Sequence, residues 1–202
     1  MAPHSFTWDA YNAAQWGRPA RPLLAVALRA VGPLPPADRV AVDLGCGEGV
    51  ETAALLADRW TVHAVDGDPA SLERLARRPD LDVSRLHLRH SAFEDLDSLP
   101  MARLVHAAWS LPYCPPAAFD NVWGLARASL APGGVLAAQL FGPHDDLVGT
   151  PGMTFHTHQE ARGLVDGLEV VHWHEEDADG TAFTGPKHWH VFHVVARRPA
   201  AP

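Results

Sequence analysis

The sequence predicts an α/β fold: a doubly wound, Rossmann-like sheet of seven strands with helices on both faces and an antiparallel last strand. Three observations lead to this prediction. Strand-like and helix-like runs alternate up to residue 166, a glycine-rich turn joins an early strand to a helix, and two strand-like runs end the chain with no helix between them. Such alternation is typical of a parallel sheet that is covered by helices.

The individual elements follow from hydrophobic periodicity. Short apolar runs predict strands near residues 39–44, 60–65, 85–90, 103–109 and 134–141. Apolar residues spaced three and four apart predict helices near residues 21–31, 50–58, 69–77, 116–130 and 158–166. The 116–130 pattern is the clearest, because prolines precede it and Pro132-Gly133-Gly134 follows it. Thr157 and Glu160 form a capping-box pattern at the start of the last helix.

The end of the chain departs from the alternation. Residues 168–175 and 187–197 both have strand character, and a polar connection at 176–185 joins them. Two strands linked in this way are most simply antiparallel. The 202 residues are enough for one α/β domain. We divide this domain into an N-terminal segment (1–20), a core (39–141) and a C-terminal part (142–197).

Composition limits the partners and the compartment. The net charge is −8 and no Lys/Arg cluster occurs, which argues against a nucleic-acid partner. Two cysteines give no disulfide framework, no signal-peptide pattern is seen, and no apolar run reaches the ~20 residues that span a membrane. We therefore expect a cytoplasmic protein that acts on a small molecule without nucleic acid or membrane, as a monomer or a homodimer.

The most informative segment is Ala-Val-Asp-Leu-Gly-Cys-Gly-Glu-Gly at residues 41–49. A hydrophobic strand ends in Asp43, and glycines follow at positions 45, 47 and 49. Glycine lets the backbone turn sharply and approach a ligand closely, and the next helix directs its free N–H groups at the turn. Strand, glycine-rich turn and helix in this order predict a nucleotide-type site.

The acidic residues around the turn indicate which ligand it binds. Asp66 ends the second strand, 19 residues after Gly47, where a carboxylate accepts hydrogen bonds from ribose hydroxyls. A pyrophosphate would be repelled by Asp43 and Glu48, since like charges ~4 Å apart cost about 4 kcal/mol at an effective dielectric of 20. S-adenosylmethionine instead carries a sulfonium and an ammonium. An adenosyl ligand is therefore favoured over a dinucleotide.

Three segments in order, residues 42–49, 65–68 and 130–136, resemble the motifs of class I S-adenosylmethionine-dependent methyltransferases. The resemblance is strongest over residues 39–141. It implies that Gly45 and Gly47 contact the methionine part of the cofactor and that Asp43 faces its amino group. It also implies that the ribose, adenosine and adenine contacts come from Asp66, Gly67, Ala92 and Phe93.

The segment at residues 8–19 resembles the opening of small bacterial methyltransferases of the tellurite-resistance and thiopurine-methylating type. In those proteins this segment covers the cofactor. The resemblance makes Tyr11, Trp16 and Arg18 candidate cofactor contacts, with Arg18 placed to bind the methionine carboxylate. The alternative is that these residues only cap the edge of the sheet.

The loop after the fourth strand borders the methyl acceptor in this family. Here it reads Ser110-Leu-Pro-Tyr113 and lacks the Asn/Asp-Pro-Pro-Tyr signature of amide and adenine-nitrogen methylation. Trp109 and Tyr113 are therefore candidate walls of the methyl site. The expected acceptor is a small molecule that offers an oxygen, sulfur, nitrogen or carboxylate atom.

Histidines are abundant: the chain has 13, and eight lie between His144 and His193. A general base is needed only if the acceptor must lose a proton, and an imidazole suits that task at neutral pH. The candidate catalytic residues are His144, His156, His158, His188 and Tyr113. Two alternatives stay open: an S-adenosylmethionine-binding protein with a different reaction, and a His-rich metal-binding protein on the same scaffold, with Glu175 or Asp177 as a ligand. We assign no residue to a metal site.

Overall fold

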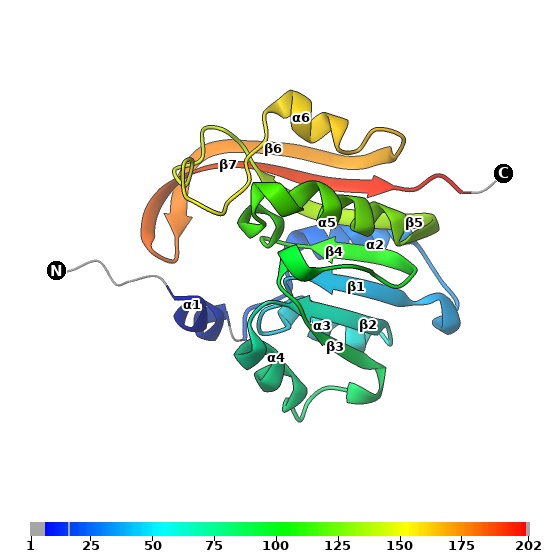
Figure 1. Cartoon of the computed structure of the whole chain (residues 1–202). Helices are drawn as coiled ribbons and strands as arrows, with labels where there is room; N and C mark the ends of the chain where they lie inside the picture. Colours follow the sequence, from blue (N-terminus) through cyan, green and yellow to red (C-terminus); the bar gives the residue numbers. More distant parts are fainter. Residues whose placement is uncertain (1–6, 16, 201–202) are drawn as a thin grey trace.

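The structure is a computed structural model that describes residues 7–15 and 17–200. Seven strands form one sheet in the order β3-β2-β1-β4-β5-β7-β6 (Figure 1). The strands are β1 (Val40–Leu44), β2 (Thr61–Asp66), β3 (Leu86–His90), β4 (Ala102–Ala107), β5 (Leu130–Phe141), β6 (Glu169–Ala182) and β7 (Gly185–Arg197). The α-helices are α1 (Trp8–Gln15), α2 (Pro22–Val31), α3 (Val50–Ala57), α4 (Pro69–Ala76), α5 (Pro116–Ala128) and α6 (His158–Gly163).

Strand direction confirms the predicted fold class. The pairs β1–β2, β1–β4, β2–β3 and β4–β5 are parallel. Strand β7 is antiparallel to both of its neighbours, β5 and β6. The carboxyl ends of β1 to β5 therefore lie along one edge of the sheet, and α1 lies at that edge in Figure 1. Ligands of open α/β sheets bind at this edge.

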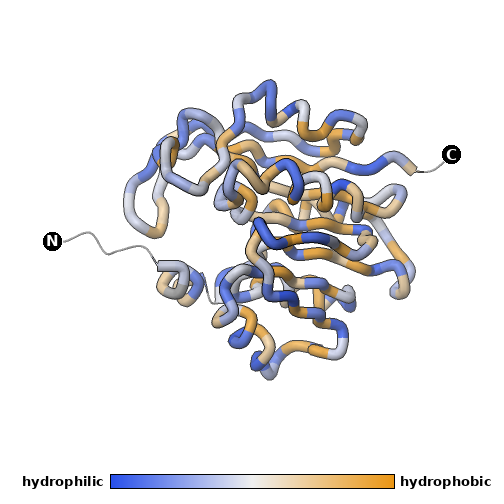
Figure 2. Tube along the Cα trace, viewed as in Figure 1, coloured by the Kyte–Doolittle hydropathy of each residue, from blue (hydrophilic) through white to orange (hydrophobic). Residues whose placement is uncertain are grey.

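Two hydrophobic cores lie on opposite faces of the sheet, because successive strand residues point to opposite sides. On β4, Leu104 packs into the core beneath α2 and α3, and Val105 packs into the core beneath α5 and α6. Helix α5 has the predicted buried stripe, which includes Phe119 and Trp123. Figure 2 shows the hydrophobic residues concentrated along the central strands.

The structure differs from the sequence-based expectation in three places. The N-terminal segment contains a helix, α1, which the sequence analysis does not assign. Strand β5 begins at Leu130, so Pro132-Gly133-Gly134 lies inside the strand rather than before it, beside a shift in the β4–β5 register. Strands β6 and β7 extend through most of the expected connection and leave only residues 183 and 184 between them.

The hairpin β6–β7 extends beyond the carboxyl ends of the parallel strands and curves towards α1 (Figure 1). Its outer strand, β6, is largely exposed and rich in acidic residues, as is common for an edge strand that resists aggregation. Phe183 at the tip meets the Tyr11 ring of α1 edge to face, with ring centroids 5.9 Å apart. No described helix combines the length and apolar character needed to cross a membrane.

Candidate functional site

A cavity of about 850 Å³ opens at the carboxyl ends of β1, β2 and β4, between these ends and α1. Ligand pockets are typically about 300–1,000 Å³, so this volume has room for a cofactor and a small second ligand. The cavity brings together ten of the residues predicted from sequence: Tyr11, Arg18, Gly45, Gly47, Asp66, Gly67, Ala92, Phe93, Trp109 and Tyr113.

The glycine-rich turn forms the floor of the cavity. Gly45 has φ +69°, a conformation that L side chains rarely adopt, and a Cβ there would lie 2.3 Å from the Cβ of Ser110. The turn is therefore pressed against the loop that follows β4. Gly47 has φ +51°, and a Cβ on it would lie 3.3 Å from the amide oxygen of Asn12 in α1. The positive φ at both positions favours glycine, and at Gly45 a Cβ would also overlap Ser110.

Asp66 connects the two predicted cofactor motifs. Its carboxylate accepts the Gly47 N–H at 2.7 Å and the Asp68 N–H at 2.8 Å. Burial raises the pKa of Asp66, and these two backbone donors act against that effect. Two hydrogen-bond donors therefore fix the carboxylate at the tip of β2, where it faces the cavity.

The other acids of this region are already paired. The Glu48 carboxylate accepts a hydrogen bond from Nε of Arg74 at 2.7 Å. The Glu51 carboxylate accepts hydrogen bonds from both terminal nitrogens of Arg18, at 2.6 and 2.8 Å. Asp43 lies behind the turn, only 3% exposed, and accepts the Thr52 hydroxyl at 2.6 Å. The charge argument from sequence is therefore reproduced only in part: Glu48 lines the cavity but is paired with Arg74, and Asp43 is not among the described lining residues.

Arg18 and Arg21 have different partners. The fork of Arg18, expected to bind a ligand carboxylate, binds Glu51 instead. Arg21 lies with its guanidinium carbon 5.3 Å from the centroid of the Trp109 ring and donates to the Tyr11 hydroxyl at 3.2 Å and to Gln15 at 3.3 Å. Within the described part of the chain, its guanidinium contacts no carboxylate, and burial lowers its pKa.

Aromatic rings line the side of the cavity next to Arg21. Trp8 meets Tyr113 edge to face at 4.7 Å, and Trp109 meets Trp189 at 5.0 Å. Trp109 has φ +57°, which is uncommon for a non-glycine residue, and its N–H donates to the buried side-chain oxygen of Gln139 at 3.2 Å. Such strain costs about 1–3 kcal/mol and concentrates at functional sites.

The four candidate histidines lie elsewhere. None of them is among the described residues that line the cavity. His156 is buried against Phe119, with ring centroids 4.5 Å apart. The other three pair with carboxylates of β6: His144 and His188 with Asp177, and His158 with Glu175. Tyr113 is thus the one predicted catalytic residue that the structure brings to the cavity.

Some cavity residues carry no clear signal in the sequence. Trp8, Asn12, Gln15, Arg21 and Arg74 all line the cavity. Four of them come from α1 and the residues that follow it, and a spacing of 3 to 4 residues on this short helix would have suggested a shared face. Arg21 has no local pattern that marks it. Trp16, a candidate contact, lies outside the described residues.

Comparisons with known proteins agree with this geometry. A sequence profile for a family described as "Methyltransferase domain" matches residues 42–136. TehB from Haemophilus influenzae is similar in structure, with a TM-score of 0.76 and 12% identity over 95% of this chain and 67% of that chain. No curated protein sequence matches the chain.

Two further structures contain a demethylated cofactor product. The 1,6-didemethyltoxoflavin-N1-methyltransferase of Burkholderia thailandensis, with 1,6-didemethyltoxoflavin and S-adenosylhomocysteine, has a TM-score of 0.70 and 20% identity over 95% of this chain and 83% of that chain. The N-methyltransferase NodS of Bradyrhizobium japonicum, with S-adenosylhomocysteine, has a TM-score of 0.67 and 17% identity over 97% of this chain and 90% of that chain. At such identities the likeness concerns the fold.

Proposed function

We propose that the chain is a class I S-adenosylmethionine-dependent methyltransferase and that it methylates a small, planar acceptor that enters the cavity already ionised; the methyltransferase profile over residues 42–136 and the shared fold support this. When bound, the cofactor supplies an electrophilic methyl group. The turn at Gly45 and Gly47 suits such a ligand, since both residues line the cavity and carry no side chain to keep a ligand from the backbone. We assign the ribose hydroxyls to Asp66 and the adenine ring to Ala92 and Phe93.

The proposal that the acceptor arrives ionised rests on one observation: the described residues of the cavity offer no suitable histidine, tyrosine or cysteine as a general base. No histidine is among the described residues that line the cavity. Burial raises the pKa of Tyr113 to about 12, so its phenol stays protonated at neutral pH and acts as a hydrogen-bond donor. Burial also raises the pKa of the Cys46 thiol well above its usual range. An acceptor that has already lost its proton needs none of these groups as a base.

Five carboxylates are among the described residues that line the cavity, and all lie in or beside the segments that we assign to the cofactor: Glu48, Glu51, Asp66, Asp68 and Glu94. Glu48, Glu51 and Asp66 are held by Arg74, Arg18 and backbone N–H groups respectively. Their negative charge suits a cationic cofactor and would repel an anionic acceptor. The acceptor is therefore proposed to enter on the opposite side, beside Trp109, Tyr113 and Arg21. Positioning then provides most of the catalysis, as in other reactions of two bound reactants.

The lining of this side favours a planar anion. Flat rings stack on aromatic side chains, and Trp8, Tyr11, Trp109 and Tyr113 offer four of them. Arg21 adds a cation whose side-chain hydrogen bonds go to the neutral groups of Tyr11 and Gln15 in the described structure. Burial lowers its pKa more than the nearby charge of Glu51 raises it, so an anion would offset the remaining cost of burial. Two structurally similar proteins were solved with flat ring compounds, 1,6-didemethyltoxoflavin and apigenin.

Matched acceptors test the proposal. The purified enzyme is incubated with S-adenosylmethionine and planar aromatic compounds in pairs: arylcarboxylates with arylcarboxamides, and acidic with weakly acidic arylthiols and phenols. Release of S-adenosylhomocysteine is measured by mass spectrometry. We expect turnover with ionised members and at least tenfold less with their uncharged counterparts. Turnover confined to uncharged amines or weakly acidic hydroxyl compounds would contradict the proposed acceptor class, while leaving methyl transfer itself intact.

A further inference from the structure

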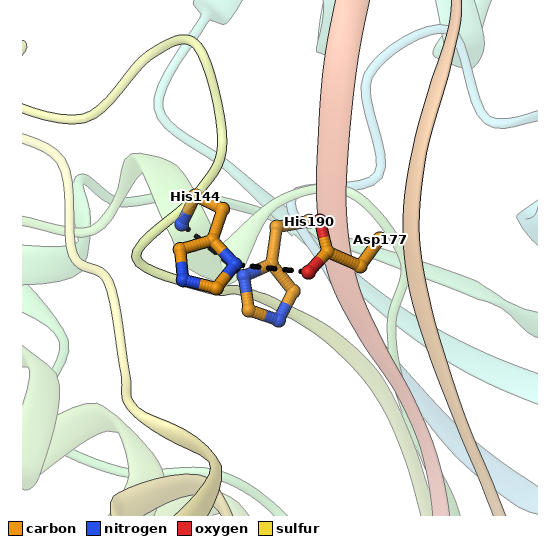
Figure 3. A group of neighbouring side chains, drawn as sticks. All are labelled: His144, Asp177 and His190. Atoms are coloured by element: carbon orange, nitrogen blue, oxygen red, sulfur yellow. Dashed lines mark hydrogen bonds and ion pairs between the residues drawn. The ribbon is translucent and has the colours of Figure 1, made fainter.

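Three histidines and a group of carboxylates meet on the side of the molecule formed by the loop after β5 and the hairpin β6–β7. His144 comes from the loop, Asp177 from β6, and His190 from β7 (Figure 3). One nitrogen or oxygen atom from each of these three lies within 4.8 Å of the other two. None of the three lines the cofactor cavity. Segments distant in the sequence thus present two imidazoles and a carboxylate to one another.

His190 is fixed in the orientation that a metal ligand needs. Its side chain is 3% exposed, and it packs so closely on Gly142 that a Cβ there would lie 2.4 Å from the imidazole ring. Its Nδ1 accepts the backbone N–H of His144 at 3.2 Å, so Nδ1 carries the lone pair. Its Nε2 must then carry the proton, and it faces Glu175 at 3.0 Å. A carboxylate on the far nitrogen is the usual support of a metal-binding histidine.

Asp177 is supported in the same way. One carboxylate oxygen faces His144 Nδ1 at 2.9 Å, and the other faces His188 Nε2 at 2.7 Å. Two ligands bound to one tetrahedral ion at bonds of about 2.0–2.1 Å lie about 3.3 Å apart. The hydrogen-bond distance of 2.9 Å between His144 Nδ1 and Asp177 therefore has to widen only by less than about 0.5 Å to reach this ligand spacing.

Two movements at His144 are needed: its side chain turns, and its backbone N–H leaves the lone pair of His190 Nδ1. Its ring stacks on that of His190, with centroids 4.7 Å apart and planes 27° apart, so the two lone pairs do not yet converge. His144 is 64% exposed and has room to rotate, whereas His190 is held in place. A cation would also replace the weak 3.2 Å hydrogen bond at Nδ1 of His190 with a stronger bond.

We propose that His144, Asp177 and His190 bind one divalent transition-metal ion, with Zn²⁺ as the preferred ion. Two imidazole nitrogens select a borderline ion of this kind over Mg²⁺ and Ca²⁺, which require oxygen ligands. Three protein ligands leave a fourth position for water. The ion links the loop after β5 to the hairpin β6–β7 and plays no part in binding the cofactor.

Zinc binding to the tag-free protein tests this site. The protein is dialysed against EDTA and then against metal-free buffer, and it is titrated with ZnCl₂ by calorimetry with parallel metal analysis. We expect one Zn²⁺ per chain, with MgCl₂ giving no binding at the same concentrations. Zinc should also raise the melting temperature in a concentration-dependent way, because it binds the folded state. A chain that binds no added Zn²⁺, or that binds MgCl₂ equally well, would overturn the proposal.

Exposed ligands make suitable variants, because their removal leaves the core intact. His144→Ala and Asp177→Ala are each expected to weaken zinc binding at least tenfold. His174→Ala, an exposed histidine on the same strand β6, is the matched control and should bind as the original protein does. Unchanged affinity in both ligand variants, or an equal loss in the control, would show non-specific binding by surface histidines. Binding of S-adenosylhomocysteine, measured in parallel, should be the same in all three variants.

Discussion

The carboxylate of Asp66 accepts the backbone N–H of Gly47 at 2.7 Å and so ties the tip of β2 to the glycine-rich turn. The two motifs that the sequence analysis identified separately therefore form one surface. This surface holds the adenosyl ligand in our account, with Asp66 at its centre.

Asp66→Asn tests the role of this carboxylate. An amide keeps the size of the side chain but loses the charge that strengthens its hydrogen bonds. A hydrogen bond to a charged group is worth about 1.5–3 kcal/mol, so we expect S-adenosylhomocysteine to bind about 10- to 100-fold more weakly. Calorimetry measures this change. Glu73→Gln, an exposed acid on α4, is the control, and equal affinity in the two variants would exclude the proposed contact.

Gly45→Ala is expected to destabilise the protein. Its φ of +69° strains any side chain, and the added Cβ would lie 2.3 Å from that of Ser110. We expect a loss of about 2–4 kcal/mol in the free energy of unfolding, from backbone strain and overpacking together. Urea denaturation measures it.

A second substitution separates the contribution of overpacking from that of backbone strain. Ser110→Gly removes the atom that clashes, so Gly45→Ala should cost less in the Ser110→Gly background. In a double-mutant cycle we expect about 1–2 kcal/mol of favourable coupling, within the range for residues in contact. Additive effects would mean that the turn and the loop after β4 do not touch.

Arg21→Gln should separate acceptor binding from cofactor binding. Arg21 faces Trp109 and Tyr11, whereas Arg18 is held by Glu51. We expect Arg21→Gln to raise the KM for an ionised acceptor at least tenfold and to leave the affinity for S-adenosylhomocysteine within about twofold of its original value. If S-adenosylhomocysteine affinity falls by the same factor as acceptor affinity, Arg21 binds the methionine carboxylate instead.

His156 should make stability depend on pH. Burial lowers its pKa below the usual 6.5, against the opposite effect of Glu160, and its Nδ1 has no hydrogen-bond partner in the described structure. The unfolded chain therefore takes up a proton more readily. The contribution of His156 to the free energy of unfolding is therefore complete above pH 6.5. It falls as the pH drops through 6.5 towards the pKa of the folded state, by at most about 1.4 kcal/mol per pH unit.

His156→Leu removes this dependence. The free energy of unfolding, measured in urea at pH 7.5 and pH 5.5, should fall less between the two in His156→Leu than in the original protein. His174→Leu, at an exposed position on β6, should keep the original difference. An unaltered difference in His156→Leu would show that this imidazole titrates alike in the folded and unfolded chains.

Local patterns made the geometry of the glycine-rich turn predictable. Gly45, Gly47 and Asp66 lie at or just after strand ends, where residue type and spacing define the backbone, and all three line the cavity. The sequence-based prediction that the histidines lie at the cavity was less successful. Their positions depend on how many residues of β6 and β7 pair with each other. Residues 176–185 have polar, glycine-containing sequence that reads as a connection, yet pairing with β7 extends them as strand to Ala182. That extension moves Asp177 next to His144 and His188.

The assignment of the two arginines shows the same limit. Arg18 and Arg21 are three residues apart, and nothing in the sequence says which of them faces an acid. Glu51 lies within reach of Arg18 only because α3 packs beside the segment that follows α1. Long-range pairing of this kind comes from tertiary packing, which no local pattern records.

The central claim is that the cavity binds an adenosyl ligand rather than a dinucleotide. Calorimetric titration of the purified protein with S-adenosylhomocysteine, with NAD⁺ as the comparison, tests it most directly. We expect one S-adenosylhomocysteine per chain and no saturable binding of NAD⁺ at the same concentrations. Binding of NAD⁺ without S-adenosylhomocysteine, or of neither, would contradict the account.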